Sequence, residues 1–132
     1  MLKDLLSDII KLDDILIIVR TEGAIIEMRS NLLNIRQKEK WITIGDNDGP
    51  GHMHIDSTSI SEARFIQEKK PDRTSYSIRF FYKNDEKQFS TVFAKMYDKE
   101  MNLNLSRKKL YDDLFLKYGS QKIIKFVHEL SN

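Results

Sequence analysis

TSYSIRFFYKNDEKQFSTVFAKMY, residues 74–97, is the stretch of sequence that decides the fold. Its first part alternates in character, with Tyr76, Ile78, Phe80 and Tyr82 on one face of a strand and Ser75, Ser77, Arg79 and Phe81 on the other. The polar segment NDEK, residues 84–87, is typical of a tight turn, and residues 88–97 return as a second strand. The pattern predicts an antiparallel β-hairpin.

Further strand-like segments precede this hairpin. Residues 15–30, ILIIVRTEGAIIEMRS, carry two β-branched runs around a TEG turn and predict another hairpin. WITIG, residues 41–45, is typical of a short strand with Trp41 and Thr43 on one face. HMHID, residues 52–56, is also strand-like, and SISEARFIQE continues extended, whereas residues 30–40 are ambiguous between a loop and a helical turn.

The two ends of the chain have helical periodicity. Apolar residues recur on one face of a short N-terminal helix at Leu2, Leu5, Leu6 and Ile9. Ser106 is placed to cap a helix over residues 107–118, which Gly119 ends. Ser120 is placed to cap a last helix with Ile123, Ile124, Val127 and Leu130 inward.

These segments together predict an α+β fold. We expect an antiparallel β-sheet of about seven or more strands, with flanking helices at the N- and C-termini. Neither a linker nor a repeat divides the chain, so residues 1–132 are expected to form a single domain.

Composition excludes several classes of function. The chain has no cysteine, which rules out disulfides, thiolate metal sites and a cysteine nucleophile. The formal net charge is only +2, which makes no case for nucleic acid or an anionic membrane as a partner. The longest apolar run, ILIIV, is far shorter than a bilayer span, and acids interrupt the N-terminal apolar residues. We therefore expect a soluble, cytoplasmic protein.

The most distinctive motif is a histidine pair in GDNDGPGHMHID, residues 45–56. Because strand side chains alternate, His52 and His54 face one side and Met53 and Ile55 the other. Two imidazoles in this arrangement can share a metal, with Asp56 as a further ligand. Haem needs fewer protein ligands than a mononuclear metal site, since one or two axial ligands suffice. The pair can equally lie on an ordinary, half-exposed strand face, and His128 is the only other histidine.

The central hairpin offers two further candidate features. Its aromatic stripe can floor a pocket for a flat apolar ligand, or it can simply be the sheet face that packs on the helices. Arg79, on the opposite face, can meet a ligand carboxylate or can be solvated. We find no catalytic signature, no phosphate-binding loop and no calcium loop in register.

Three loose motifs, taken in order, point to a known family. The first is the entry Gly51, His52, Met53 and Asp56; the second spans Phe65, Pro71, Ser75, Ser77, Ile78 and Phe80; the third holds Phe89, Phe93, Asp98 and Leu103. Over about residues 14 to 115 the chain resembles the ChuX/HutX family of intracellular haem-utilisation proteins. That family is related to each half of the larger HemS-type haem carriers.

The resemblance implies a HemS/ChuX-like fold, a homodimer and haem binding for carriage or storage. On this hypothesis His52 is the axial ligand of the haem iron, with His54 as a neighbour or alternative. The ring contacts would be Tyr76, Phe80 or Phe81, and Arg79 would meet a propionate. Two alternatives stay open: a cofactor-free dimeric interaction module, and a haem-degrading enzyme on the same scaffold. Since no proton or electron donor is apparent, a binding protein is favoured over an enzyme.

Overall fold

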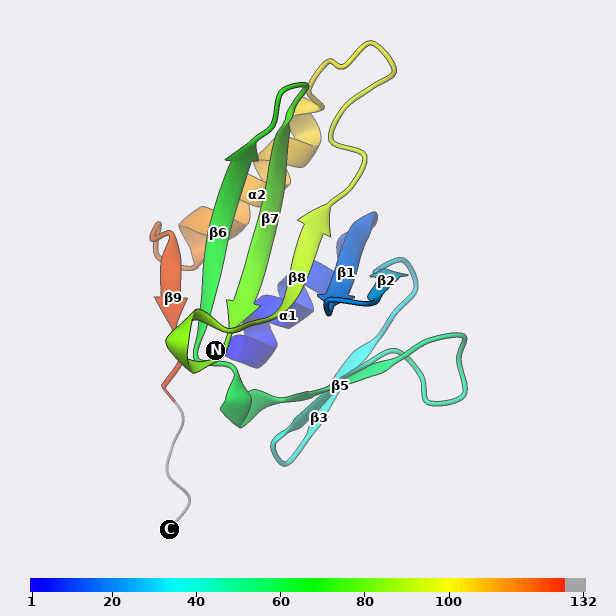
Figure 1. The fold of residues 1–132 in the computed structure, drawn as a ribbon, viewed down its shortest axis with the longest axis vertical. Helices are drawn as coiled ribbons and strands as arrows, with labels where there is room; N and C mark the ends of the chain where they lie inside the picture. Colours follow the sequence, from blue (N-terminus) through cyan, green and yellow to red (C-terminus); the bar gives the residue numbers. More distant parts are fainter. Residues whose placement is uncertain (128–132) are drawn as a thin grey trace.

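The computed structural model describes residues 1–127 (Figure 1). Within this part the elements are α1 (Leu2–Ile10), β1 (Ile15–Arg20), β2 (Ile25–Arg29), β3 (Ile35–Lys38), β4 (Trp41–Ile44), β5 (Met53–Asp56), β6 (Glu62–Lys69), β7 (Thr74–Phe81), β8 (Lys87–Phe93), α2 (Leu105–Lys117) and β9 (Ile123–Lys125), with single 3₁₀ turns at Ser57–Ser59 and Lys83–Asp85. None of the described helices is long and apolar enough to cross a membrane.

The strands form two antiparallel sheets. The larger has six strands in the order β2-β1-β8-β7-β6-β9, and the smaller has three in the order β3-β4-β5. Both helices lie on the same side of the larger sheet, behind its strands in Figure 1. The α+β class, the antiparallel pairing and the flanking helices are therefore confirmed. The division of the strands between two sheets is the feature that the sequence did not indicate.

The predicted central hairpin is confirmed as β7–β8. Ile78 lies opposite Thr91, and Phe80 lies opposite Phe89, with a bulge where the register shifts between Phe80 and Phe81. The rings of Phe80 and Phe89 stack with centroids 4.5 Å apart. Because the aromatic stripe of β7 faces the helices, it forms the floor of the core. The opposite face of the six-stranded sheet, which we call the open face, carries Ser75, Ser77 and Arg79.

Helix α2 is anchored on the larger sheet by Tyr111. Its side chain is 1% exposed, and its hydroxyl donates a hydrogen bond to the Ser77 carbonyl at 3.0 Å. Burial of this phenol raises the pKa of Tyr111 above its usual range. Three aromatic rings surround it at edge-to-face centroid distances of 5.2 to 5.6 Å: Phe65, Tyr76 and Phe93.

Helix α1 joins the two sheets. Leu5, Leu6 and Ile9 are fully buried, and the helix also contacts β3 of the smaller sheet. The inner face of that sheet contributes Ile42, Ile44 and Ile55 to the same core. Its other side chains therefore point away from the core, and they form the surface discussed below.

Two helix predictions are wrong. Asn104, not Ser106, caps α2, because its side-chain oxygen accepts the Arg107 N–H at 3.1 Å. The helix predicted after Ser120 is instead β9, which pairs with β6 and buries Ile124 but leaves Ile123 exposed. A strand satisfies this alternation better than a helix, since one residue in two faces the core. Gly119 ends α2 as predicted, at a φ of +100°. Leu130 and His128 lie outside the described residues.

A carboxylate bridges the two helices. Asp8 of α1 accepts hydrogen bonds from the Lys117 ammonium at 2.7 Å and the Tyr118 hydroxyl at 2.6 Å. Burial alone would raise the pKa of Asp8, but these hydrogen bonds outweigh it and lower the pKa to about 2.

We expect Asp8→Asn to remove a pH-dependent part of the stability. Since the folded-state pKa lies below the unfolded value of 3.8, Asp8 stabilises the fold above about pH 4 and ceases to do so as the pH falls toward 2. The contribution is about 2 kcal/mol. Urea unfolding across this range should show a shallower fall for Asp8→Asn than for wild type. Asp113→Asn, which breaks only an exposed pair with Lys109, is the control and should retain the wild-type slope.

Candidate functional site

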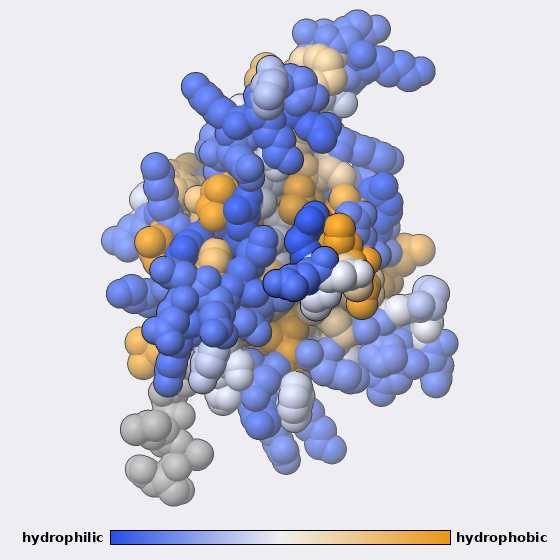
Figure 2. All heavy atoms as spheres, in the orientation of Figure 1, coloured by the Kyte–Doolittle hydropathy of each residue, from blue (hydrophilic) through white to orange (hydrophobic). Residues whose placement is uncertain are grey.

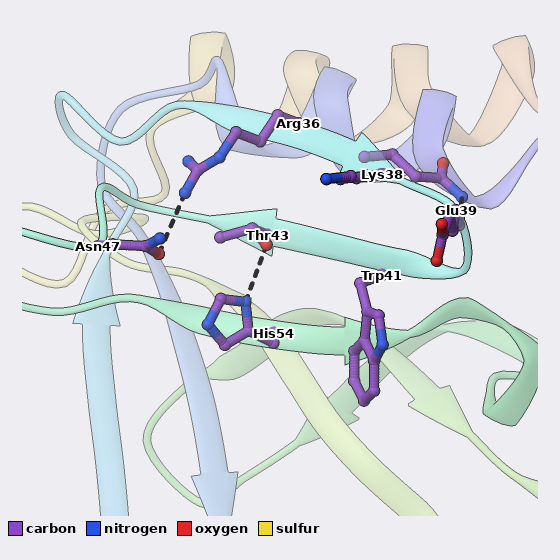
Figure 3. Close-up of a pocket in the computed structure, with 8 residues that line it drawn as sticks. Arg36, Lys38, Glu39, Trp41, Thr43, Asn47 and His54 are labelled. Atoms are coloured by element: carbon purple, nitrogen blue, oxygen red, sulfur yellow. Dashed lines mark hydrogen bonds between the residues drawn. The ribbon is translucent and has the colours of Figure 1, made fainter.

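The smaller sheet exposes a row of polar and aromatic side chains. On the face turned away from the core, which we call the outer face, Arg36 of β3 lies opposite Thr43 of β4, which lies opposite His54 of β5. In the next row, Lys38 lies opposite Trp41, which lies opposite Asp56. Apart from Asp56, which it does not draw, Figure 3 shows these side chains projecting from one side of the three strands.

His52 and His54 are both exposed on this outer face, as the alternation of β5 predicts. Their ring centroids are 5.1 Å apart, with the planes inclined at 69°. Ile55 is buried on the inner face, and Met53 packs partly against the core. The structure therefore offers two adjacent imidazoles that no core packing encloses.

One ring nitrogen of His54 is already engaged. The Thr43 hydroxyl lies 2.8 Å from His54 Nδ1, and this hydrogen bond holds the imidazole against β4 (Figure 3). The other ring nitrogen, Nε2, is left to meet a ligand. A hydrogen bond at one nitrogen is a common means of orienting a ligating histidine.

An open pocket of about 730 Å³ lies along the outer face (Figure 3). It is lined by Arg36, Gln37, Lys38, Glu39, Trp41, Thr43, Asn47 and His54. Its volume is in the range of small-molecule and cofactor sites. Two cations, an exposed tryptophan and a histidine suit a ligand that is flat, aromatic and anionic.

The loop between β4 and β5 is fixed against this pocket by Arg36. The guanidinium donates to the Gly45 carbonyl at 2.9 Å and to the side-chain oxygens of Asn34 and Asn47 at 3.2 Å. Gly45 has a φ of +89°, and its α-carbon comes so close to Gly51 that a side chain there would meet the Gly51 carbonyl. This close approach therefore fixes the position of the backbone that leads into His52.

We expect Gly45→Ala to displace His52 and to destabilise the fold. The added methyl would lie 2.6 Å from the Gly51 carbonyl oxygen and 3.2 Å from the His52 Cβ. With the positive φ, the cost is at least about 1 kcal/mol. Gly23→Ala is the matched control, because nothing lies within 4 Å of the methyl there. Equal unfolding free energies for the two variants would contradict the close approach.

The remaining predicted site residues lie elsewhere. Tyr76 and Phe80 are buried in the core, 5% and 0% exposed, Tyr76 against Tyr111 of α2 and Phe80 against Phe89 of β8. Arg79 lies on the open face of the larger sheet, where it donates to Glu68 at 2.7 Å and to the Ser77 hydroxyl at 3.2 Å. Phe81 is buried on that face under the Arg64 guanidinium, 3.9 Å from its ring centroid. Of the six residues, the structure brings together only His52 and His54.

Asp56 is committed to a structural role beside the histidines. Its Oδ1 accepts the Thr58 N–H at 3.0 Å and the Thr58 hydroxyl at 2.6 Å, and Lys40 lies 3.4 Å from the other oxygen. The hydrogen bond from the Thr58 hydroxyl, opposed by burial, lowers the pKa of Asp56. Within residues 1–127, no group of three or more histidine and acidic side chains is placed to hold a metal ion.

Of the residues that line the pocket, sequence reasoning singled out only His54, and those it missed include Arg36, Lys38 and Trp41. The alternation of WITIG does place Trp41 and Thr43 on one face. Residues 30–40, however, carry no clear alternation of apolar and polar side chains, so their pairing with β4 was not predictable. That pairing is what places Arg36 and Lys38 beside Thr43 and Trp41.

Comparison with known proteins bears on this architecture. A search of the curated proteins gives no match. Among solved structures, one described as ChuX is 16% identical, with a TM-score of 0.75 over 88% of this chain and 71% of that one. A protein from Erwinia carotovora is 21% identical, with a TM-score of 0.73 over 88% and 70% of the two chains. A further structure, described as the heme-binding protein ChuX, is 15% identical, with a TM-score of 0.72 over 86% and 70%. A protein-family model also matches residues 3–119, and the chain belongs to the ChuX-type family.

Proposed function

We propose that this protein binds haem, or a closely related tetrapyrrole, and acts as a carrier or store. In this proposal His52 is the axial ligand of the iron, with His54 as its neighbour or alternative. The observation that carries it is the pair of exposed imidazoles 5.1 Å apart beside a pocket of about 730 Å³. Structural similarity to a protein described as the heme-binding protein ChuX supports the choice of ligand.

The residues present fit such a group. When bound, haem would supply an iron that can take an imidazole nitrogen as a ligand, and His52 or His54 would provide that nitrogen. The chain provides two adjacent imidazoles, His54 on β5 and His52 immediately before this strand, and the Thr43 hydroxyl holds His54 in one orientation. Trp41, at 44% exposed, provides an apolar surface beside them. Because the pocket is open on one side, a bound ligand would stay partly accessible, which suits binding followed by release.

A homodimer and a cytoplasmic location follow from the family resemblance and remain part of the proposal. Ring contacts from Tyr76 and Phe80 do not fit the pocket on the smaller sheet, because both side chains are buried in the core. Phe81 and Arg79 also lie on the larger sheet, on its open face. An Arg79→Gln variant tests whether Arg79 meets a propionate: we expect wild-type haemin affinity, whereas a loss of about tenfold would place the ligand beside Arg79.

The experiment that tests the proposal is a haemin titration of the purified protein followed by absorbance. We expect saturable binding, one haemin per chain or per dimer, with a shifted Soret band. Spectra that match free haemin at every ratio would contradict it and favour an interaction module without a cofactor. Addition of a reductant tests the enzyme alternative, because a carrier keeps the band whereas a haem-degrading enzyme loses it with turnover.

A further inference from the structure

The outer face of the smaller sheet has a second binding feature besides its histidines. Trp41 is the only tryptophan in the chain, and 44% of it is exposed although it lies in the middle strand of a sheet. Lys40 Nζ lies 5.3 Å from the centroid of its ring. An exposed aromatic ring on a rigid strand is a surface on which another flat ring can stack.

Two cations lie on the neighbouring strand, Lys38 opposite Trp41 and Arg36 opposite Thr43. Arg36 and Lys38 are two residues apart in β3, so their side chains leave the same face about 7 Å apart. Among residues 1–127, Lys38 has no ion-pair partner. The Arg36 guanidinium is held at the opposite end by the β4–β5 loop. Glu39, in the turn, is the single carboxylate that lines the pocket.

We propose that this pocket recognises planar aromatic dicarboxylates as a class, with or without a bound iron. Trp41 stacks on the ring, while Lys38 and Arg36 pair with two carboxylates on one edge of it. The inference rests on the proposed function, since it concerns the same surface, and it names the chemistry that selects the ligand.

This mode of recognition does not depend on a metal. Stacking and charge-assisted hydrogen bonds act on the ring and its carboxylates, which an iron-free porphyrin also carries. Ligation by histidine would add affinity for the iron form. The pocket should therefore bind the iron-free ring more weakly than haemin, and it should reject a ring whose carboxylates are esterified.

The test is a titration with protoporphyrin IX and with its dimethyl ester, followed by the emission of the porphyrin itself. We expect saturable binding of the free acid and binding of the ester weaker by at least about tenfold. Lys38→Gln and Trp41→Ala should each weaken binding of the free acid by about tenfold. Trp41→Phe keeps an aromatic ring and should bind as wild type. Lys87→Gln removes a cation from the pocket on the open face and should also change nothing.

The result separates this inference from the proposed function. If Lys38→Gln and Trp41→Ala bind protoporphyrin IX as wild type does, or if nothing binds it, the inference is overturned. Haemin binding that depends on the histidines would then leave the proposed function intact. Conversely, if protoporphyrin IX binds through Lys38 and Trp41 while haemin shows no histidine-dependent spectrum, the inference holds and axial ligation fails. Within residues 1–127 the Lys38 side chain makes no hydrogen bond or ion pair, so its variant should fold.

Discussion

Tyr111→Ala is expected to lower the free energy of unfolding by about 3–5 kcal/mol. Tyr111 is 1% exposed and fills the space between α2 and the larger sheet, where three aromatic rings contact it. Its removal would leave a cavity at the centre of the helix–sheet contact and the Ser77 carbonyl without its donor. Because domains of this size are stable by about 5–15 kcal/mol, much of the stability would be lost.

Two companion variants separate the parts of this effect. Tyr111→Phe keeps the ring and loses the hydrogen bond, so we expect a cost of about 1 kcal/mol. Leu116 lies on the exposed side of the same helix and is 65% exposed. We therefore expect Leu116→Ala to lower the free energy of unfolding by less than about 0.5 kcal/mol. Urea unfolding at neutral pH measures all three. If Leu116→Ala cost as much as Tyr111→Ala, Tyr111 would not be the anchor of α2.

The double variant His52→Ala/His54→Ala is expected to weaken haemin binding by more than about 100-fold. Altering a group that merely orients a metal ligand already costs about 10- to 100-fold in affinity. His52 and His54 are the only histidines among residues 1–127, so the double variant removes both imidazoles from the described structure. Both side chains are exposed, so their removal should leave the unfolding free energy nearly unchanged. Absorbance titration of the folded variant provides the measurement.

Thr43→Val identifies which histidine is the ligand. Within residues 1–127 the Thr43 hydroxyl hydrogen-bonds to His54 and to no other side chain. Its loss should therefore weaken haemin binding by about tenfold if His54 is the ligand and leave binding unchanged if His52 is. His128→Ala controls for unspecific imidazole binding and should behave as wild type. If the double variant binds haemin with wild-type affinity, neither histidine is part of the binding site.

The central part of the fold was predictable because its signals are local. The alternation in residues 74–97 and the polar NDEK turn specify a hairpin within one stretch of chain, and the structure contains it. The helix of residues 2–9 follows equally from its apolar period. In contrast, the segment after Ser120 contains two adjacent isoleucines that suit a helix or a strand. Only the free edge of β6 decides in favour of a strand, and that edge is not visible in the local sequence.

The site was predictable only in part, for the same reason. Strand alternation correctly placed His52 and His54 on one face, because that inference needs only neighbouring residues. Whether Arg79 and the aromatic stripe lie on the same surface as the two histidines depends on how the strands divide between the two sheets. Residues 30–40 have no clear period, so the sequence did not predict β3. Arg36 and Lys38, which β3 places on the same outer face as the histidines, were therefore missed.

The most direct test of the binding surface is to map it with a diamagnetic haem analogue. Gallium protoporphyrin IX, added to ¹⁵N-labelled protein, reports contacts through changes in amide chemical shift. We expect the changes to concentrate in residues 35–38, 41–44 and 52–56, on the three strands of the smaller sheet. Changes centred instead on Ser75–Arg79 and Gln88–Val92, on the open face of the larger sheet, would contradict this account and place the ligand beside Arg79.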